Sequence, residues 1–115
     1  MITHPTAAEL VAGVAAWMPV DGSAPPFAMR VARNALEIAG RDLTLGPAAD
    51  ARAAARMREL LGQEGTRDEL DRALVAAIRG GTIAPDESAL VEHLRLCALD
   101  TLAIDQPRYA HQLTP

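Results

Sequence analysis

The sequence predicts an all-α protein, a single-domain antiparallel bundle of about five helices with a central, buried C-terminal helix. Apolar side chains recur at helical spacing in several segments, whereas no alternation with a period of two runs far enough for a strand. The connections are short and contain Gly or Pro. Residues 90–104 are apolar around almost the whole helical circumference, which is typical of a buried helix.

The first helix is predicted to begin at Ala7, because Thr6 and Glu9 have the spacing of a capping box. Apolar residues, among them Trp17, then share one face, and Pro19 ends the helix. We expect Trp17 to be a core residue.

The middle of the chain predicts two helices, over residues 26–43 and 47–61, separated by the segment TLGP at residues 44–47. In the first of them an apolar arc faces a charged side, on which Arg33, Glu37 and Arg41 form two i,i+4 pairs. In the second, Arg52, Arg56 and Glu59 are expected to point outward.

The last two helices are also predicted from signals at their starts and ends. Thr66 and Glu69 repeat the capping-box spacing, and Gly80 with Gly81 ends the fourth helix. Pro85 leads into the long final helix, around which we expect the others to pack.

Length and composition limit the classes of protein. The 115 residues fit one domain, 1–115, and the net charge of −4 argues against a protein that binds duplex nucleic acid. No apolar run reaches the roughly 20 residues that a membrane-spanning helix needs, and no targeting signal opens the chain. A single cysteine, Cys97, fits a reducing compartment, so we expect a cytoplasmic protein.

Catalytic chemistry is poorly represented. His93 and Cys97 lie four residues apart on one helix and could form a Cys/His pair or two metal ligands, but nothing completes a tetrahedral site. Cys97 is expected inside the helix packing and His93 at its edge. We therefore predict no metal, no cofactor and no catalytic residue, and favour a protein that is not an enzyme.

Five residues are candidates for ligand binding. Asn34 lies at the edge of the apolar arc, where a half-buried amide needs partners, and Arg30 lies one turn before it. Asp105, Arg108 and Tyr109 gather around Pro107 at the end of the last helix, where a local anchoring of the C-terminus is an alternative.

Several short motifs resemble a small bacterial all-helical family of unknown function. These motifs are His4-Pro5-Thr6, Arg30-Val31-Ala32, Asn34-Ala35-Leu36, Leu45-Gly46-Pro47, and Asp105 with Pro107-Arg108-Tyr109. The resemblance covers essentially the whole chain. It implies genes that lie beside an aminoglycoside-phosphotransferase-like kinase and an acyl-CoA dehydrogenase, and it carries no established catalytic residue.

Two functional hypotheses follow. The first is a non-enzymatic accessory or interaction module for the phosphotransferase or the acyl-CoA pathway enzyme. The alternative is a protein or enzyme that binds a small phosphate- or carboxylate-bearing ligand, if Arg30 and Asn34 converge with Asp105, Arg108 and Tyr109. Self-association through an uncovered apolar strip, giving a homo-oligomer, is compatible with either.

Overall fold

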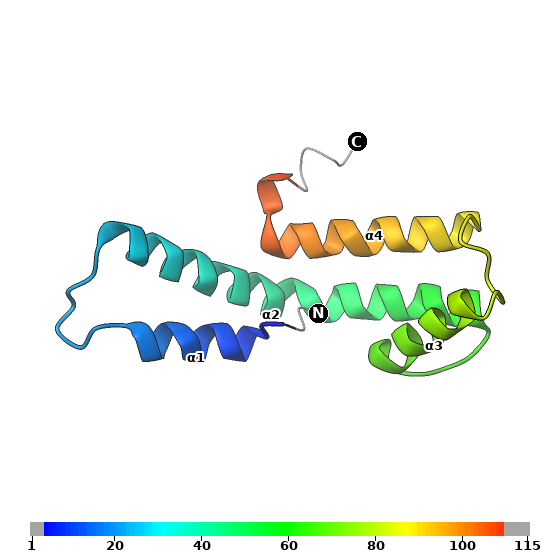
Figure 1. Cartoon of the computed structure of the whole chain (residues 1–115), viewed down its shortest axis with the longest axis horizontal. Coiled ribbons are helices and arrows are strands. Elements are labelled where there is room, and N and C mark those ends of the chain that lie inside the picture. Colours follow the sequence, from blue (N-terminus) through cyan, green and yellow to red (C-terminus); the bar gives the residue numbers. More distant parts are fainter. Residues whose placement is uncertain (1–3, 110–115) are drawn as a thin grey trace. The chain divides into compact units, whose positions relative to one another are not determined.

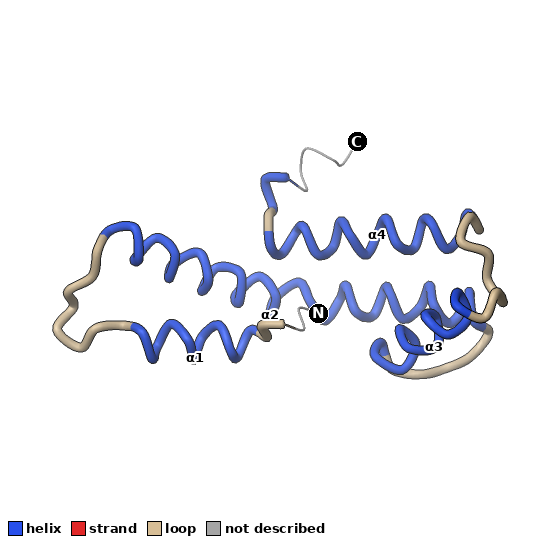
Figure 2. Tube along the Cα trace, viewed as in Figure 1, coloured by secondary structure: helices blue, strands red, loops and turns tan. Residues whose placement is uncertain are grey.

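Residues 4–109 are described by a computed structural model, and within them the chain is helical without strands (Figures 1 and 2). The helices are α1 (Ala7–Trp17), α2 (Pro26–Leu61), α3 (Arg67–Arg79) and α4 (Ser88–Asp105). A short helical turn follows at residues 107–109. The predicted all-α class is confirmed.

The chain divides into two compact units, which we call unit 1 (Met1–Gly46) and unit 2 (Pro47–Pro115). Unit 1 holds α1 and the first part of α2. Unit 2 holds the second part of α2 together with α3 and α4.

Two of the predicted helix starts are confirmed in atomic detail. The Thr6 hydroxyl oxygen accepts a hydrogen bond from the Glu9 backbone N–H at 3.1 Å. At α3 the capping box is complete, because the Thr66 hydroxyl accepts from the Glu69 N–H at 3.2 Å and the Glu69 carboxylate accepts from the Thr66 N–H at 3.1 Å. Each cap satisfies backbone donors that a helix start otherwise leaves unpaired.

The predicted break at residues 44–47 is wrong, because α2 continues through Pro47 as one helix of 36 residues. Proline removes a single backbone donor, and the Ala-rich sequence that follows it strongly favours helix. Gly46 does not adopt the positive φ of a helix-ending glycine, whereas Gly62, which follows the true end of α2, does, at 65°.

Unit 1 is an antiparallel helical hairpin with a thin core. α1 lies alongside the first part of α2 (Figure 1). The buried apolar residues are mostly small: Ala7, Val14, Ala32 and Ala39. Large apolar side chains of this hairpin therefore stay exposed, Trp17 among them, and its predicted place in the core is wrong.

Unit 2 has the larger core, to which all three of its helices contribute. The core cluster consists of Ala53, Ala54, Met57, Leu70, Leu74 and Leu90. α4 runs antiparallel to the second part of α2, since Arg52 pairs with Asp100 at 3.2 Å while Arg56 contacts His93.

The C-terminal helix is not the sheltered centre that the sequence predicts. Leu90, His93 and Ile104 are buried, but Val91 and Leu94 are each 50% exposed. A three-helix arrangement buries one side of each helix, so the remaining apolar side chains of α4 face outward.

None of the helices within residues 4–109 combines the length and the hydropathy that a bilayer-spanning segment needs.

Candidate functional site

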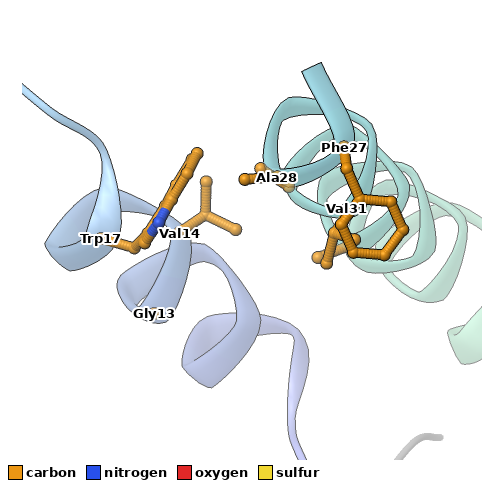
Figure 3. A pocket seen from close by; sticks show the side chains of 8 residues that line it. Gly13, Val14, Trp17, Phe27, Ala28 and Val31 are labelled. Carbon is orange, nitrogen blue, oxygen red and sulfur yellow. The ribbon is translucent and has the colours of Figure 1, made fainter. Parts of the chain in front are cut away.

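An apolar groove lies between α1 and the start of α2 in unit 1. Its volume is about 330 Å³. The lining residues are Gly13, Val14, Trp17, Phe27, Ala28, Val31, Ala32 and Ala35. Figure 3 shows Trp17 and Val14 on α1 opposite Ala28, Phe27 and Val31 on α2. The volume lies at the lower end of the range that ligand pockets occupy.

Local sequence explains how the groove forms. The turn between the helices is fixed by Asp21, whose carboxylate accepts hydrogen bonds from the Ser23 N–H at 3.0 Å and the Ser23 hydroxyl at 2.7 Å. These bonds hold the pKa of Asp21 below its ordinary value. Gly22 supplies the positive φ, 75°, that the turn requires.

Small residues form the floor of the groove, and aromatic residues form its sides. Gly13, Ala28, Ala32 and Ala35 leave space because they carry almost no side chain. Phe27 is 70% exposed and Trp17 is 41% exposed, although both are residues that proteins usually cover. The groove therefore offers a large apolar contact area to a partner.

Arg30 and Asn34 both lie on the exposed surface of α2 in unit 1. At about 100° per residue, they flank Phe27 and Val31 along one edge of the groove. The predicted half-buried position of Asn34 is wrong, since its side chain is exposed. The edge of the groove thus carries one cation, Arg30, and one amide, Asn34, beside the apolar lining.

Asp105, Arg108 and Tyr109 lie in unit 2, at the end of α4 and in the helical turn after it. All three are exposed, and the Tyr109 N–H donates to the Gln106 carbonyl oxygen at 3.0 Å. The structure brings these three residues together within unit 2 and Arg30 with Asn34 within unit 1. Convergence of the two groups stays a prediction.

A partly buried polar cluster joins the three helices of unit 2. Arg56 Nε donates to His93 Nδ1 at 3.0 Å, and Arg56 Nη2 lies 3.5 Å from Cys97 Sγ. Arg67, on α3, pairs with Asp50 at 2.9 Å and with Asp71 at 3.3 Å. Two predictions are wrong here, because His93 is only 2% exposed and Arg56 turns inward to contact it. Cys97 is partly buried and packs against the core cluster of unit 2, in agreement with its predicted place in the helix packing.

The cluster favours a neutral histidine. Burial lowers the pKa of His93, and the positive charges of Arg56 and Arg67 lower it further. Because Nδ1 accepts from Arg56, the proton of the neutral imidazole resides on Nε2, which lies 3.6 Å from Cys97 Sγ. These contacts hold three helices in register, so we assign the cluster a structural role.

Metal chemistry finds no geometric support in the described part of the chain, where no three His, Cys, Asp or Glu side chains gather as metal ligands. A hollow of about 290 Å³ beside His93 is lined by Arg56, Glu59, Leu60, Ala89, Glu92 and His93. Two of its charged groups are already engaged, Glu92 with Arg95 at 2.6 Å and Arg56 with His93. The third, Glu59, is exposed on α2. The groove of unit 1 is therefore the better candidate site.

A family model described as "Domain of unknown function (DUF6285)" matches residues 21–109. The comparisons with curated proteins and with solved structures give no significant match.

Proposed function

The chain belongs to the DUF6285 family of domains of unknown function, and we propose that it is a non-enzymatic accessory module that binds another protein. The observation that carries this proposal is the open apolar groove of unit 1, with Trp17 and Phe27 exposed at its walls. Exposed aromatic side chains beside a hollow are typical of protein-binding surfaces.

The geometry of the groove favours a helical segment as the bound element. Two antiparallel helices leave between them a furrow into which the apolar side of a third helix packs. Arg30 lies on its edge and forms no ion pair within residues 4–109. A partner helix with an acidic residue beside its apolar side would match this cation.

The candidate partners are the phosphotransferase-like kinase and the acyl-CoA dehydrogenase that the family resemblance implies. Both are proposals, as is a cytoplasmic location for the complex. An accessory role suits the described residues, because the polar cluster of unit 2 forms contacts between helices and no set of polar side chains among residues 4–109 resembles a catalytic arrangement.

Binding experiments with each purified enzyme test the proposal. Trp17 is the only tryptophan and lines the groove, so its fluorescence reports directly on groove occupancy when the partner is prepared with tryptophan analogues that do not emit. We expect Phe27→Asp to weaken binding at least tenfold. Val75→Asp is the matched control, because Val75 is an exposed apolar residue of α3 in unit 2.

The proposal fails if neither enzyme is retained by the tagged protein, or if F27D and V75D weaken binding equally. Circular dichroism of both variants shows whether the helices are intact. Because Phe27 is mostly exposed, its replacement removes contact area without opening a cavity in the core.

A small-ligand binder is the second candidate, favoured by Arg30 at the edge of an apolar groove. An acyl chain that ends in a carboxylate would place its tail on Ala28 and Ala32 and its charge near Arg30. Titration with decanoate, followed by Trp17 emission, tests this hypothesis. A saturable change that Arg30→Gln weakens supports it, and an unchanged spectrum excludes it.

A further inference from the structure

The helical hairpin of unit 1 is apolar on both of its broad faces. One face carries the groove, which Phe27 and Val31 of α2 line. On the other side of α2, Met29, Leu36 and Leu43 are spaced seven residues apart, and all three are exposed. At about 100° per residue they lie within roughly 40° of one another and about 160° around α2 from Phe27 and Val31. We call the two sides of the hairpin the groove face and the second face.

α1 contributes apolar side chains to the second face as well. Val11 lies about 120° around α1 from Trp17 of the groove face, and the buried Ala7 and Val14 separate the two. Met18 follows Val11 by seven residues, and both side chains are exposed. Viewed from one end, residue positions advance clockwise around one antiparallel helix and counterclockwise around the other (Figure 1). Val11 and Met18 therefore lie on the same side of the hairpin as the three exposed residues of α2.

Charged side chains lie outside both faces. Apart from the buried Asp42, the charged residues within positions 26–46 fall in an arc of about 80° on the side of α2 away from the buried Ala32 and Ala39. These charged residues are Arg30, Arg33, Glu37 and Arg41. α1 carries a single charged residue, Glu9, near its start. The centres of protein interfaces are depleted of charge in the same way, so both faces have the composition of a surface that another protein covers.

The exposed area decides how many faces a partner covers. The residues of the second face are Val11, Met18, Met29, Leu36 and Leu43, and those of the groove face are Trp17, Phe27 and Val31. At roughly 80–100 Å² each, about half of what a large side chain can bury, the second face exposes about 400–500 Å² and the groove face about 240–300 Å². A standard interface needs about 800 Å² per partner. Neither face supplies this area alone, but the two faces together approach it.

We infer that the partner of the proposed function, on which this inference rests, covers both faces, so that the hairpin becomes the middle layer of a three-layer helical assembly. One straight helix cannot cover both faces, because they lie on opposite sides of the hairpin. The partner therefore presents a cleft between two helices that receives the hairpin. The axes of these two helices lie about 16–20 Å apart, twice the usual distance between packed helices.

The two faces select different helices of the partner. The groove face has aromatic sides and the cation Arg30 at its edge, which an acidic residue of the partner would match. Beside the second face, the nearest charges are Arg33 and Glu37, and they already pair with each other at 2.9 Å. A helix that packs there needs an apolar side and no complementary charge. The methionines of the second face adapt their shape to such a helix, because their side chains are flexible.

Thiol labelling of the full chain tests which faces the partner covers. In a Cys97→Ser background, which removes the only natural thiol, single cysteines are placed on the groove face by Val31→Cys and on the second face by Leu36→Cys. Glu37→Cys is the control, because Glu37 is exposed on the charged side of the same helix. With a saturating amount of the enzyme that the tagged protein retains, alkylation by N-ethylmaleimide should slow at least tenfold in V31C and L36C and stay unchanged in E37C.

The outcomes separate this inference from the proposed function. If the enzyme protects V31C but L36C reacts at the same rate with and without it, the partner covers the groove face alone, and the inference is overturned while the proposed function stands. If V31C is not protected, or if neither enzyme is retained, the proposed function is contradicted and this inference with it. Protection of L36C that increases with the concentration of the chain itself, or that phosphatidylcholine vesicles produce, would identify a different occupant and overturn the inference.

A charge placed on the second face gives an independent measurement. Leu36→Asp should weaken binding of the enzyme at least tenfold, because the carboxylate would have to be buried against an apolar helix. Val75→Asp, at an exposed apolar position of unit 2, should leave binding unchanged. Circular dichroism shows whether the helices of both variants are intact. Equal binding by L36D and V75D would overturn the inference, even if F27D abolishes binding through the groove.

Discussion

His93 is a histidine whose titration should be visible in the stability of the whole protein. Burial and the charges of Arg56 and Arg67 lower its pKa from 6.5, so the unfolded chain binds a proton more readily than the folded one. Stability is therefore full above about pH 6.5 and falls as the pH decreases through the interval between the unfolded and the folded pKa. The slope reaches at most about 1.4 kcal/mol per pH unit for one proton.

Urea unfolding between pH 7.5 and pH 5 measures this loss. The interval lies above the region in which Asp21, Glu69 and Glu92 titrate, because hydrogen bonds hold the pKa of each below its ordinary value. His93→Gln should be less stable at pH 7.5 but should lose less stability on acidification. An equally steep decline in His93→Gln would show that another group causes it. His4→Gln, at an exposed histidine, is the control.

The polar cluster around His93 shows that the helical periodicity of a sequence does not determine which side chains meet between helices. Helical spacing places Arg56 outside the apolar stripe of its helix, yet a long side chain can turn back along the surface and reach a partner on another helix. The spacing of His93 and Cys97 on one helix is evident from the sequence. The approach of Arg56 and Arg67 from α2 and α3 depends on tertiary packing, and no local pattern indicates it.

At the scale of the helix, the capping box of α3 should carry a measurable share of the stability. Thr66→Ala removes the acceptor of the Glu69 N–H, a change that costs about 1 kcal/mol at other helix starts. Thermal unfolding measures the difference. Thr82→Ala is the control, because Thr82 is exposed in the connection after α3, and no helix cap depends on its side chain. A loss shared equally by both variants would contradict the capping argument.

Pro47 should limit the stability of α2. Within a helix interior proline leaves one carbonyl without its donor, and alanine restores that donor. We expect Pro47→Ala to raise the free energy of unfolding by about 1–3 kcal/mol. Pro26→Ala is the matched control, since proline in a first helical turn removes no helical hydrogen bond. Destabilisation by Pro47→Ala would mean that proline serves the packing at this position.

Local chemistry explains which helix boundaries the sequence predicts well. A capping box acts over four residues and depends on little else, so Thr6 and Thr66 mark true starts. A glycine followed by proline is weaker evidence for an end, because long helices tolerate one missing hydrogen bond when strong helix formers continue. Gly46 and Pro47 therefore do not end a helix, and the two helices predicted on either side of them are one.

The two units of the molecule differ in how their apolar side chains are covered. Unit 2 encloses large residues such as Met57, Leu70 and Leu90 within three helices, whereas unit 1 encloses mainly alanines between two. The sequence predicts amphipathic helices in both units correctly. It does not show how wide an apolar face remains after packing, because that depends on which helices lie beside it, and this explains why the groove was missed.

Hydrogen exchange should separate the units. Amides of α3 should exchange slowly, since α3 contributes Leu70 and Leu74 to the core cluster of unit 2. Amides of α1 and of residues 26–45 should exchange faster, because the core of unit 1 consists mainly of alanines and buries little apolar area. Val75→Asp, at an exposed position of α3, should leave this order unchanged. Equal protection of α1 and α3 would mean that the thin hairpin is as stable as the three-helix unit, and the argument from core size would fail.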